Sequence, residues 1–202
     1  MLNRSANNHQ KQAGFTLVEL LVVISLVAII FVTFASFFTN YLILYSQYQK
    51  DSMAYSELSQ QSQRVSQVVR GATDIVAADA NEMTFYAYFS PVDSYVSQVR
   101  YYLNPSKTAL LVDVIPMTAN PPNGSLINGS KKTYTIISNF YQPSGGTLFN
   151  YYDSSATAIN LPITDQHTIQ SVQVNIAAPG SHTKNGQNLS VTVSLRNRKT
   201  NL

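Results

Sequence analysis

The amino-acid sequence predicts an α+β protein in which one long N-terminal helix packs on an antiparallel β-sheet. The 56 residues from Phe15 to Arg70 contain neither glycine nor proline, the residue types that most disfavour a helix interior. At 1.5 Å per residue, an unbroken helix over this stretch would be about 84 Å long. Beyond Gly71, apolar and polar residues alternate in several short segments. A period of two is typical of strands with one buried face.

The helix begins with a segment that is long and apolar enough to cross a membrane. No charged residue lies between Glu19 and Lys50, and Leu20–Phe38 is apolar except for two serines and one threonine. A membrane helix needs about 20 such residues, whereas the apolar core of a cleaved signal peptide has about 7–15. Arg4 and Lys11 precede the segment, which favours an N-terminus in the cytoplasm and a C-terminal domain outside.

Glu19 lies inside this apolar helix. A carboxylate in a membrane segment costs roughly 2.5–3.5 kcal/mol on insertion scales, so it requires a cationic partner. Cleavage after Gly14 would create such a partner, the α-amine of Phe15, one helical turn before Glu19 or opposite the Glu19 of a neighbouring copy. A carboxylate at the level of the lipid headgroups is the alternative interpretation.

The sequence Gly14-Phe15-Thr16-Leu17-Val18-Glu19, followed at once by an apolar helix, resembles the processing motif of type IV prepilins and type II secretion pseudopilins. The resemblance implies a pilin-like fold. It also implies that a prepilin peptidase cuts between Gly14 and Phe15 and methylates the Phe15 amine. Glu19 would then guide assembly with other pilin or pseudopilin subunits into a filament.

These observations predict three parts of the chain. Residues 1–14 are a leader peptide that is removed, and residues 15–46 are a transmembrane and filament-core helix, with membrane contact through 15–45. Residues 47–202 form an outer globular domain, built from an amphipathic helix at 47–70 and a β-sheet within 72–202.

The predicted amphipathic helix has one apolar face. Its charged and amide side chains lie elsewhere on the helix, as expected for a segment that packs on a sheet. The face comprises Ala54, Leu58, Gln61, Val65 and Val68, with Met53, Val69 and Ala72 beside it, while Lys50, Glu57, Gln60, Gln63 and Arg64 point away.

Strands are predicted wherever the period of two is clear. Turn residues at 142–146 predict a hairpin between the strand before them and Phe149. Pro116–Ser130 and Ala177–Gln187 are rich in proline and glycine and predict loops. The predicted strands are Met83–Phe89, Val99–Leu103, Thr108–Ile115, Thr133–Tyr141, Val172–Ile176 and Leu189–Leu195.

Four pairs of adjacent aromatic residues lie in or near these strands: Phe85-Tyr86, Tyr101-Tyr102, Phe140-Tyr141 and Tyr151-Tyr152. Adjacent strand residues face opposite sides, so one ring of each pair should be buried and the other exposed. The exposed rings could cover the sheet, or form an adhesive or nucleic-acid-stacking surface. In the second case, positive charge for binding would come from a basic patch made of Lys131, Lys132, Arg196 and Arg198.

The remaining sequence offers no catalytic pattern. The three histidines, His9, His167 and His182, have no metal-ligand spacing, and there is neither a cysteine nor a glycine-rich phosphate loop among the 202 residues. The net charge is +3 and charged residues make up 11%, which does not indicate a strongly basic nucleic-acid binder. We therefore predict a protein that is not an enzyme and holds no metal or cofactor.

Within the pilin class, three roles remain open. The segments Arg70–Ile75, Met83–Tyr86, Val99–Tyr102 and Leu195–Arg198 faintly resemble those of J-type minor pseudopilins and W-type minor pilins, which belong to a priming or tip complex. This favours a minor subunit of a type IV pilus or type II secretion-like filament. The alternatives are a major pilin, or a competence-type pseudopilin with a DNA- or surface-binding face.

Overall fold

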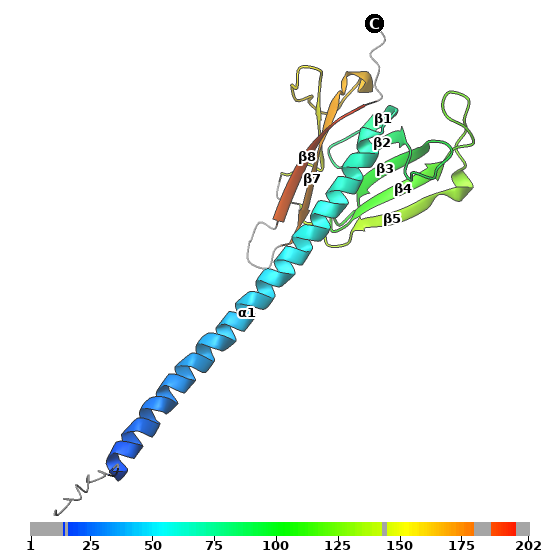
Figure 1. Cartoon of the computed structure of the whole chain (residues 1–202). Coiled ribbons are helices and arrows are strands. Elements are labelled where there is room, and N and C mark those ends of the chain that lie inside the picture. Colours follow the sequence, from blue (N-terminus) through cyan, green and yellow to red (C-terminus); the bar gives the residue numbers. More distant parts are fainter. Residues whose placement is uncertain (1–13, 15, 143–144, 180–186, 197–202) are drawn as a thin grey trace, which may run out of the picture. The chain divides into compact units, whose positions relative to one another are not determined.

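The computed structural model describes residues 14, 16–142, 145–179 and 187–196 (Figure 1). It confirms the predicted α+β class, with one long helix packed against antiparallel sheets. The helix α1 spans Leu17–Arg70. The strands are β1 (Asp74–Ala78), β2 (Glu82–Ala87), β3 (Ser97–Leu103), β4 (Leu110–Pro116), β5 (Lys132–Ile137), β6 (Phe149–Tyr152), β7 (Ser171–Ala178) and β8 (Gln187–Ser194).

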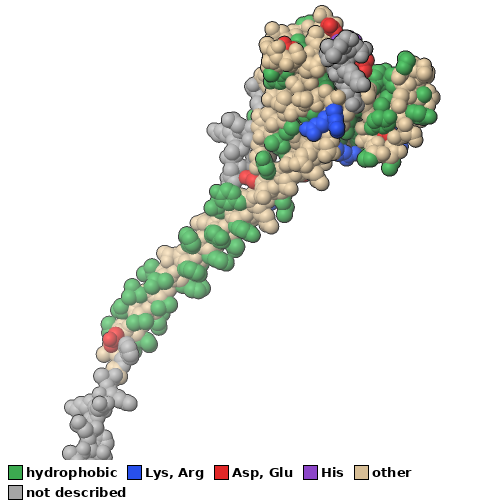
Figure 2. Space-filling model, turned by 45° about the horizontal axis from the view of Figure 1, so that its top comes forward, with side chains coloured by type: hydrophobic (Ala, Val, Ile, Leu, Met, Phe, Trp, Pro, Cys, Tyr) green, Lys and Arg blue, Asp and Glu red, His purple; other side chains and the backbone are tan. Residues whose placement is uncertain are grey.

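The chain divides into two compact units, which meet between Tyr48 and Gln49. The first unit contains the N-terminal part of α1, whose large apolar side chains are exposed (Figure 2). Its most apolar stretch has a mean hydropathy of 2.9, sufficient for a membrane span. The hydroxyls of Ser25, Thr33 and Thr39 donate to backbone carbonyls one turn earlier. Such bonds satisfy polar groups that would otherwise be costly in lipid.

The second unit contains two sheets, where the sequence predicted one. Strands β1 to β5 form a five-stranded antiparallel sheet in chain order, and β6, β7 and β8 form a three-stranded antiparallel sheet. The hairpin predicted around residues 142–146 is therefore wrong, because β5 is the last strand of the first sheet and β6 the first strand of the second. Residues 143 and 144 lie outside the described residues.

The C-terminal part of α1 buries one face against both sheets. Leu58, Val65 and Val69 are at most 2% exposed and belong to one apolar core with the inner residues of β2, β3, β4, β6 and β7. Met53, predicted beside this face, is 63% exposed, because it lies near the start of the second unit, more than one turn before the first fully buried position. Ser62, on the same stripe, is buried in the core although it is polar.

The four aromatic pairs follow the prediction only in part, because the first ring of each is buried but no second ring is fully exposed. Their first members are at most 6% exposed, and their second members are half-buried. Tyr151 also joins the two sheets, because its hydroxyl donates to the backbone carbonyl of Asp79 at 2.9 Å, in the turn between β1 and β2. Burial raises the pKa of Tyr151, which keeps the phenol protonated as a hydrogen-bond donor.

Candidate functional site

Thr16 caps the start of α1. Its Oγ1 accepts a hydrogen bond from the backbone N–H of Glu19 at 3.3 Å, and its hydroxyl lies 3.5 Å from Glu19 Oε2. The carbonyl of Thr16 accepts from the N–H of Leu20 at 3.1 Å. A threonine followed three residues later by glutamate resembles a capping box, which satisfies amides that the first helical turn leaves without partners. The printed cap is made by the Thr16 hydroxyl and the backbone amide of Glu19, and the Glu19 carboxylate adds only the long contact with that hydroxyl. This cap was missed from the sequence, although the pattern Thr-x-x-Glu indicates it.

Gly14 lies outside the helix and is exposed. A Cβ atom built on Gly14 meets no heavy atom within 4 Å. The fold of the single chain therefore does not require glycine at this position. Phe15, the residue expected to be methylated, lies outside the described residues.

Glu19 is exposed at the first turn of α1, among apolar neighbours. Residues 16–48 contain no lysine or arginine, so the described part of this unit provides no cationic side chain for its carboxylate. The amides at the helix N-terminus favour a negative charge by about 0.3–1 kcal/mol. This is less than the cost of placing the carboxylate in lipid, which leaves a requirement for a cation from elsewhere.

The predicted basic patch does not lie on one face. Lys131 pairs with Asp113 on the face of the five-stranded sheet that points away from α1. Lys132 borders a hollow on the other side, together with Arg64 of α1 and Tyr134. Although the two lysines are consecutive, their side chains are therefore separated by the sheet.

Arg196 lies in a different part of the second unit, directly after the three-stranded sheet. Its backbone N–H donates to the carbonyl of Arg70, the last residue of α1, at 3.2 Å. Its side chain is exposed. Arg198 lies outside the described residues, so the structure does not place the second arginine of the patch.

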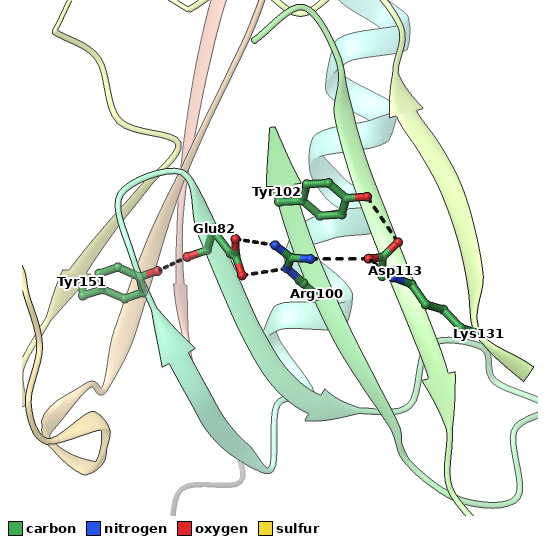
Figure 3. Close-up of polar contacts among 6 residues, drawn as sticks. All are labelled: Glu82, Arg100, Tyr102, Asp113, Lys131 and Tyr151. Carbon is green, nitrogen blue, oxygen red and sulfur yellow. Dashed lines mark hydrogen bonds and ion pairs between the residues drawn. The ribbon is translucent and has the colours of Figure 1, made fainter. Parts of the chain in front are cut away.

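The outer face of the five-stranded sheet carries a row of alternating charges that crosses β2, β3 and β4 and ends at Lys131, directly before β5 (Figure 3). Arg100 on β3 makes two hydrogen bonds to the carboxylate of Glu82 on β2, at 2.7 and 2.8 Å. The guanidinium also lies 4.5 Å from the ring centroid of Tyr102. Two parallel bonds between guanidinium and carboxylate fix the relative position of the two strands.

Asp113 on β4 is the buried member of this row, with a side chain only 4% exposed. Lys131 Nζ lies 2.8 Å from its Oδ2, and the hydroxyl of Thr133 donates to its Oδ1 at 2.6 Å. Burial alone would raise the pKa of Asp113, but the contacts with Lys131 and Thr133 outweigh burial and hold this pKa below its usual range. The carboxylate is thus stabilised in its charged form and ties β4 to β5.

We expect Asp113→Asn to lower the free energy of unfolding by about 1–3 kcal/mol, because Lys131 loses its counter-charge and Thr133 its charged acceptor. The pKa of Asp113 is lower in the folded chain than in the unfolded chain. Its contribution is therefore fully present above the ordinary carboxyl pKa of about 3.9 and is lost as the pH falls below that value. Thermal unfolding between pH 7 and pH 3 measures both effects. Glu82→Gln, at a more exposed carboxylate, is the matched control and should cost less.

The first unit is a single apolar helix with an exposed, capped N-terminus, which suits a single-pass membrane anchor bearing a C-terminal domain. Residues 9–35 match the family model described as the prokaryotic N-terminal methylation motif. This motif is the prepilin signal of type IV pilins and pseudopilins, and it supports a subunit of that class. No curated protein matches the chain, and the fainter resemblance to J-type and W-type subunits is not confirmed.

Pilins and pseudopilins are structural subunits rather than enzymes. Within the residues that the structure describes, no three histidine, aspartate or glutamate side chains are grouped so that they could hold a metal ion. The acidic residues of the row in Figure 3 are instead matched by Arg100 and Lys131.

Proposed function

We propose that the chain is a minor pilin or pseudopilin that is cut between Gly14 and Phe15 and N-methylated at Phe15. It assembles through α1 into a type IV pilus or type II secretion-like filament, in the priming or tip complex. The observation that carries this proposal is the methylation motif at residues 9–35, which overlaps the start of an exposed apolar helix. Prepilin peptidase and other pilin subunits are the partners.

The exposed apolar side chains of residues 17–46 support the assembly role. Leaving such a surface in water costs about 25 cal/mol for each Å², so the helix requires lipid before assembly and neighbouring helices afterwards. Residues 1–14 serve as a leader, 15–46 as the membrane and filament-core helix, and 47–202 as the outer domain. Before cleavage the N-terminus lies in the cytoplasm and the outer domain on the other side of the membrane.

Glu19 pairs with the methylated amine of Phe15 in this proposal, in the same subunit or in a neighbour. We expect Glu19→Gln to insert into the membrane but to enter filaments poorly, because the amine is then buried without a counter-charge. Glutamine is an accepted residue in a capping box, so the start of the helix is preserved. Fractionation into membrane and sheared filaments measures both outcomes.

Thr16→Val is the complementary variant, since it removes the hydroxyl cap and keeps the charge. We expect it to weaken the first turn by about 1 kcal/mol while filament entry persists. If Thr16→Val blocks assembly and Glu19→Gln does not, Glu19 acts through the cap and the charge-pairing role is wrong.

A minor role predicts low copy number. The loop Pro116–Ser130 joins β4 to β5 and is closed at its base by a hydrogen bond from Ile127 N–H to Pro116 O at 2.9 Å. A priming subunit that contacts a few specific neighbours tolerates such a projecting loop more easily than a polymer of identical copies. Quantitative mass spectrometry of sheared filaments should find this chain scarce relative to another pilin.

The same measurement separates the alternatives. If this chain is the dominant species in the filament, it is the major pilin. If it is scarce and binds DNA with a steep salt dependence, and Lys132→Gln or Arg196→Gln weakens that binding, the uptake role is favoured. A scarce subunit without DNA binding supports the proposal.

A further inference from the structure

The solvent-facing side of the three-stranded sheet carries no charged side chain among the described residues of its strands. All but one of the residues on this face have an amide or a hydroxyl group, the exception being Ala177, which is 3% exposed. The outer face of the five-stranded sheet instead carries the charged row of Figure 3. The polar residues are Asn150 and Tyr152 on β6, Ser171, Gln173 and Asn175 on β7, and Asn188, Ser190, Thr192 and Ser194 on β8.

Hydrogen bonds fix the orientation of the central amides. Gln173 Oε1 accepts from Asn150 Nδ2 at 2.9 Å and from the hydroxyl of Tyr152 at 3.0 Å. Asn175 Nδ2 donates to the carbonyl of Thr147 at 3.1 Å. These bonds leave Gln173 Nε2 as a donor and Asn175 Oδ1 as an acceptor, neither with a partner among the described residues. Side chains held in this way lose little conformational entropy when a ligand binds.

The two open amide groups lie in a surface hollow. Its lining includes Gln173 and Asn175 from β7, Asn188 and Ser190 from β8, and the half-buried ring of Tyr141 before β6. Neighbouring strands repeat at about 4.8 Å, close to the length of one sugar ring. The hollow thus presents uncharged donors and acceptors in rows of this spacing, with an aromatic ring at its border.

We propose that this hollow binds a neutral oligosaccharide. Sugar hydroxyls both donate and accept hydrogen bonds, as amide side chains do, so open amides on adjacent strands can engage successive hydroxyls. The apolar faces of sugar rings pack against aromatic rings such as that of Tyr141. This binding function is independent of filament assembly and depends on a different part of the chain.

Other ligand classes fit the hollow less well. A nucleic acid or an acidic glycan would require lysine or arginine to neutralise its charge, and neither occurs among the described residues that line the hollow. An apolar ligand would leave the amides of Gln173 and Asn175 buried without hydrogen bonds, at a cost of about tenfold or more in affinity for each group. A neutral ligand that forms hydrogen bonds is the class that satisfies both conditions.

Titration of the purified full-length protein in detergent tests the proposal. The probes are chitohexaose and cellohexaose, which are neutral, and a heparin hexasaccharide, which is acidic. We expect saturable binding of at least one neutral probe by isothermal calorimetry, with an affinity that changes less than about twofold between low and high salt. Failure of both neutral probes, or binding of heparin alone, would overturn the proposal.

Three variants locate the site. Gln173→Leu removes the open donor, and Ser190→Leu fills the hollow from an exposed position where the fold tolerates the change. Each should weaken binding by about tenfold or more. Gln98→Leu makes the same substitution at a half-buried position on β3 of the other sheet, and should leave binding unchanged. If Gln98→Leu weakens binding as much as Gln173→Leu, or if Ser190→Leu alters only cross-linking to other subunits, the hollow is not a glycan site.

Discussion

Gly14→Leu is expected to keep the protein at full length in the membrane and to remove almost all of it from filaments. The prepilin signal implies a peptidase that accepts glycine before the cut bond. A bulky side chain in a pocket of fixed size lowers the kcat/KM for that substrate by about 10- to 200-fold or more. The uncut leader would keep the Phe15 nitrogen in a peptide bond, so no amine could pair with Glu19. Immunoblots of membranes and sheared filaments measure both effects.

Gly129→Leu is the matched control for this prediction. A Cβ atom on Gly129 meets no heavy atom within 4 Å, as at Gly14, and Gly129 lies in the exposed 3₁₀ turn Asn128–Ser130. Glycine replacement on an exposed surface should therefore leave processing and assembly unchanged. Normal cleavage of the Gly14→Leu protein at the same bond would show that the peptidase does not require glycine at position 14, contrary to the proposal.

Val65→Asp is expected to unfold the second unit. Val65 is 0% exposed and lies on the face of α1 that packs in the core. A carboxylate there would have no cationic partner, at a cost of about 3 kcal/mol or more, which is a large fraction of the 5–15 kcal/mol that stabilises a typical domain. The near-ultraviolet circular dichroism of the tyrosines should be lost, while the detergent-embedded part of α1 remains helical.

Gln63→Asp provides the comparison, since it introduces the same residue on the exposed side of the same helix. Its free energy of unfolding should lie within about 0.5 kcal/mol of that of the parent. If Val65→Asp retains the tyrosine signal and the protease resistance of the parent, α1 does not pack as the structure shows.

Local sequence patterns were sufficient to predict α1 and six of the strands. Absence of glycine and proline defined the helix to within two residues, and alternation placed β7 and β8 because one face of each is buried. The pattern missed β1, where only Ile75 is buried, and β6, which has four residues. Neither segment is long or regular enough to show a period.

The division into two sheets depends on contacts between distant residues. Phe149 begins β6 and pairs with Val174 on β7, so the chain leaves the first sheet after β5 and starts a second one. Turn residues at 142–146 are compatible with a hairpin and equally with such a crossing. Strand pairing, rather than the turn sequence, decides between them.

The processing motif could be read from sequence because its residues are consecutive. The charged row could not, since Glu82, Arg100 and Asp113 meet only through the register of three strands. The same holds for the amide hollow, where Gln173 and Ser190 come from paired strands of the second sheet. Sites of this kind become visible only when the pairing is known.

Mass spectrometry of the N-terminal peptide from filament-associated protein is the most direct test of processing and assembly. We expect the chain in filaments to begin at Phe15 and to carry one methyl group on its α-amine. A filament-associated chain that still begins at Met1, or a cut at any other bond, would contradict this expectation.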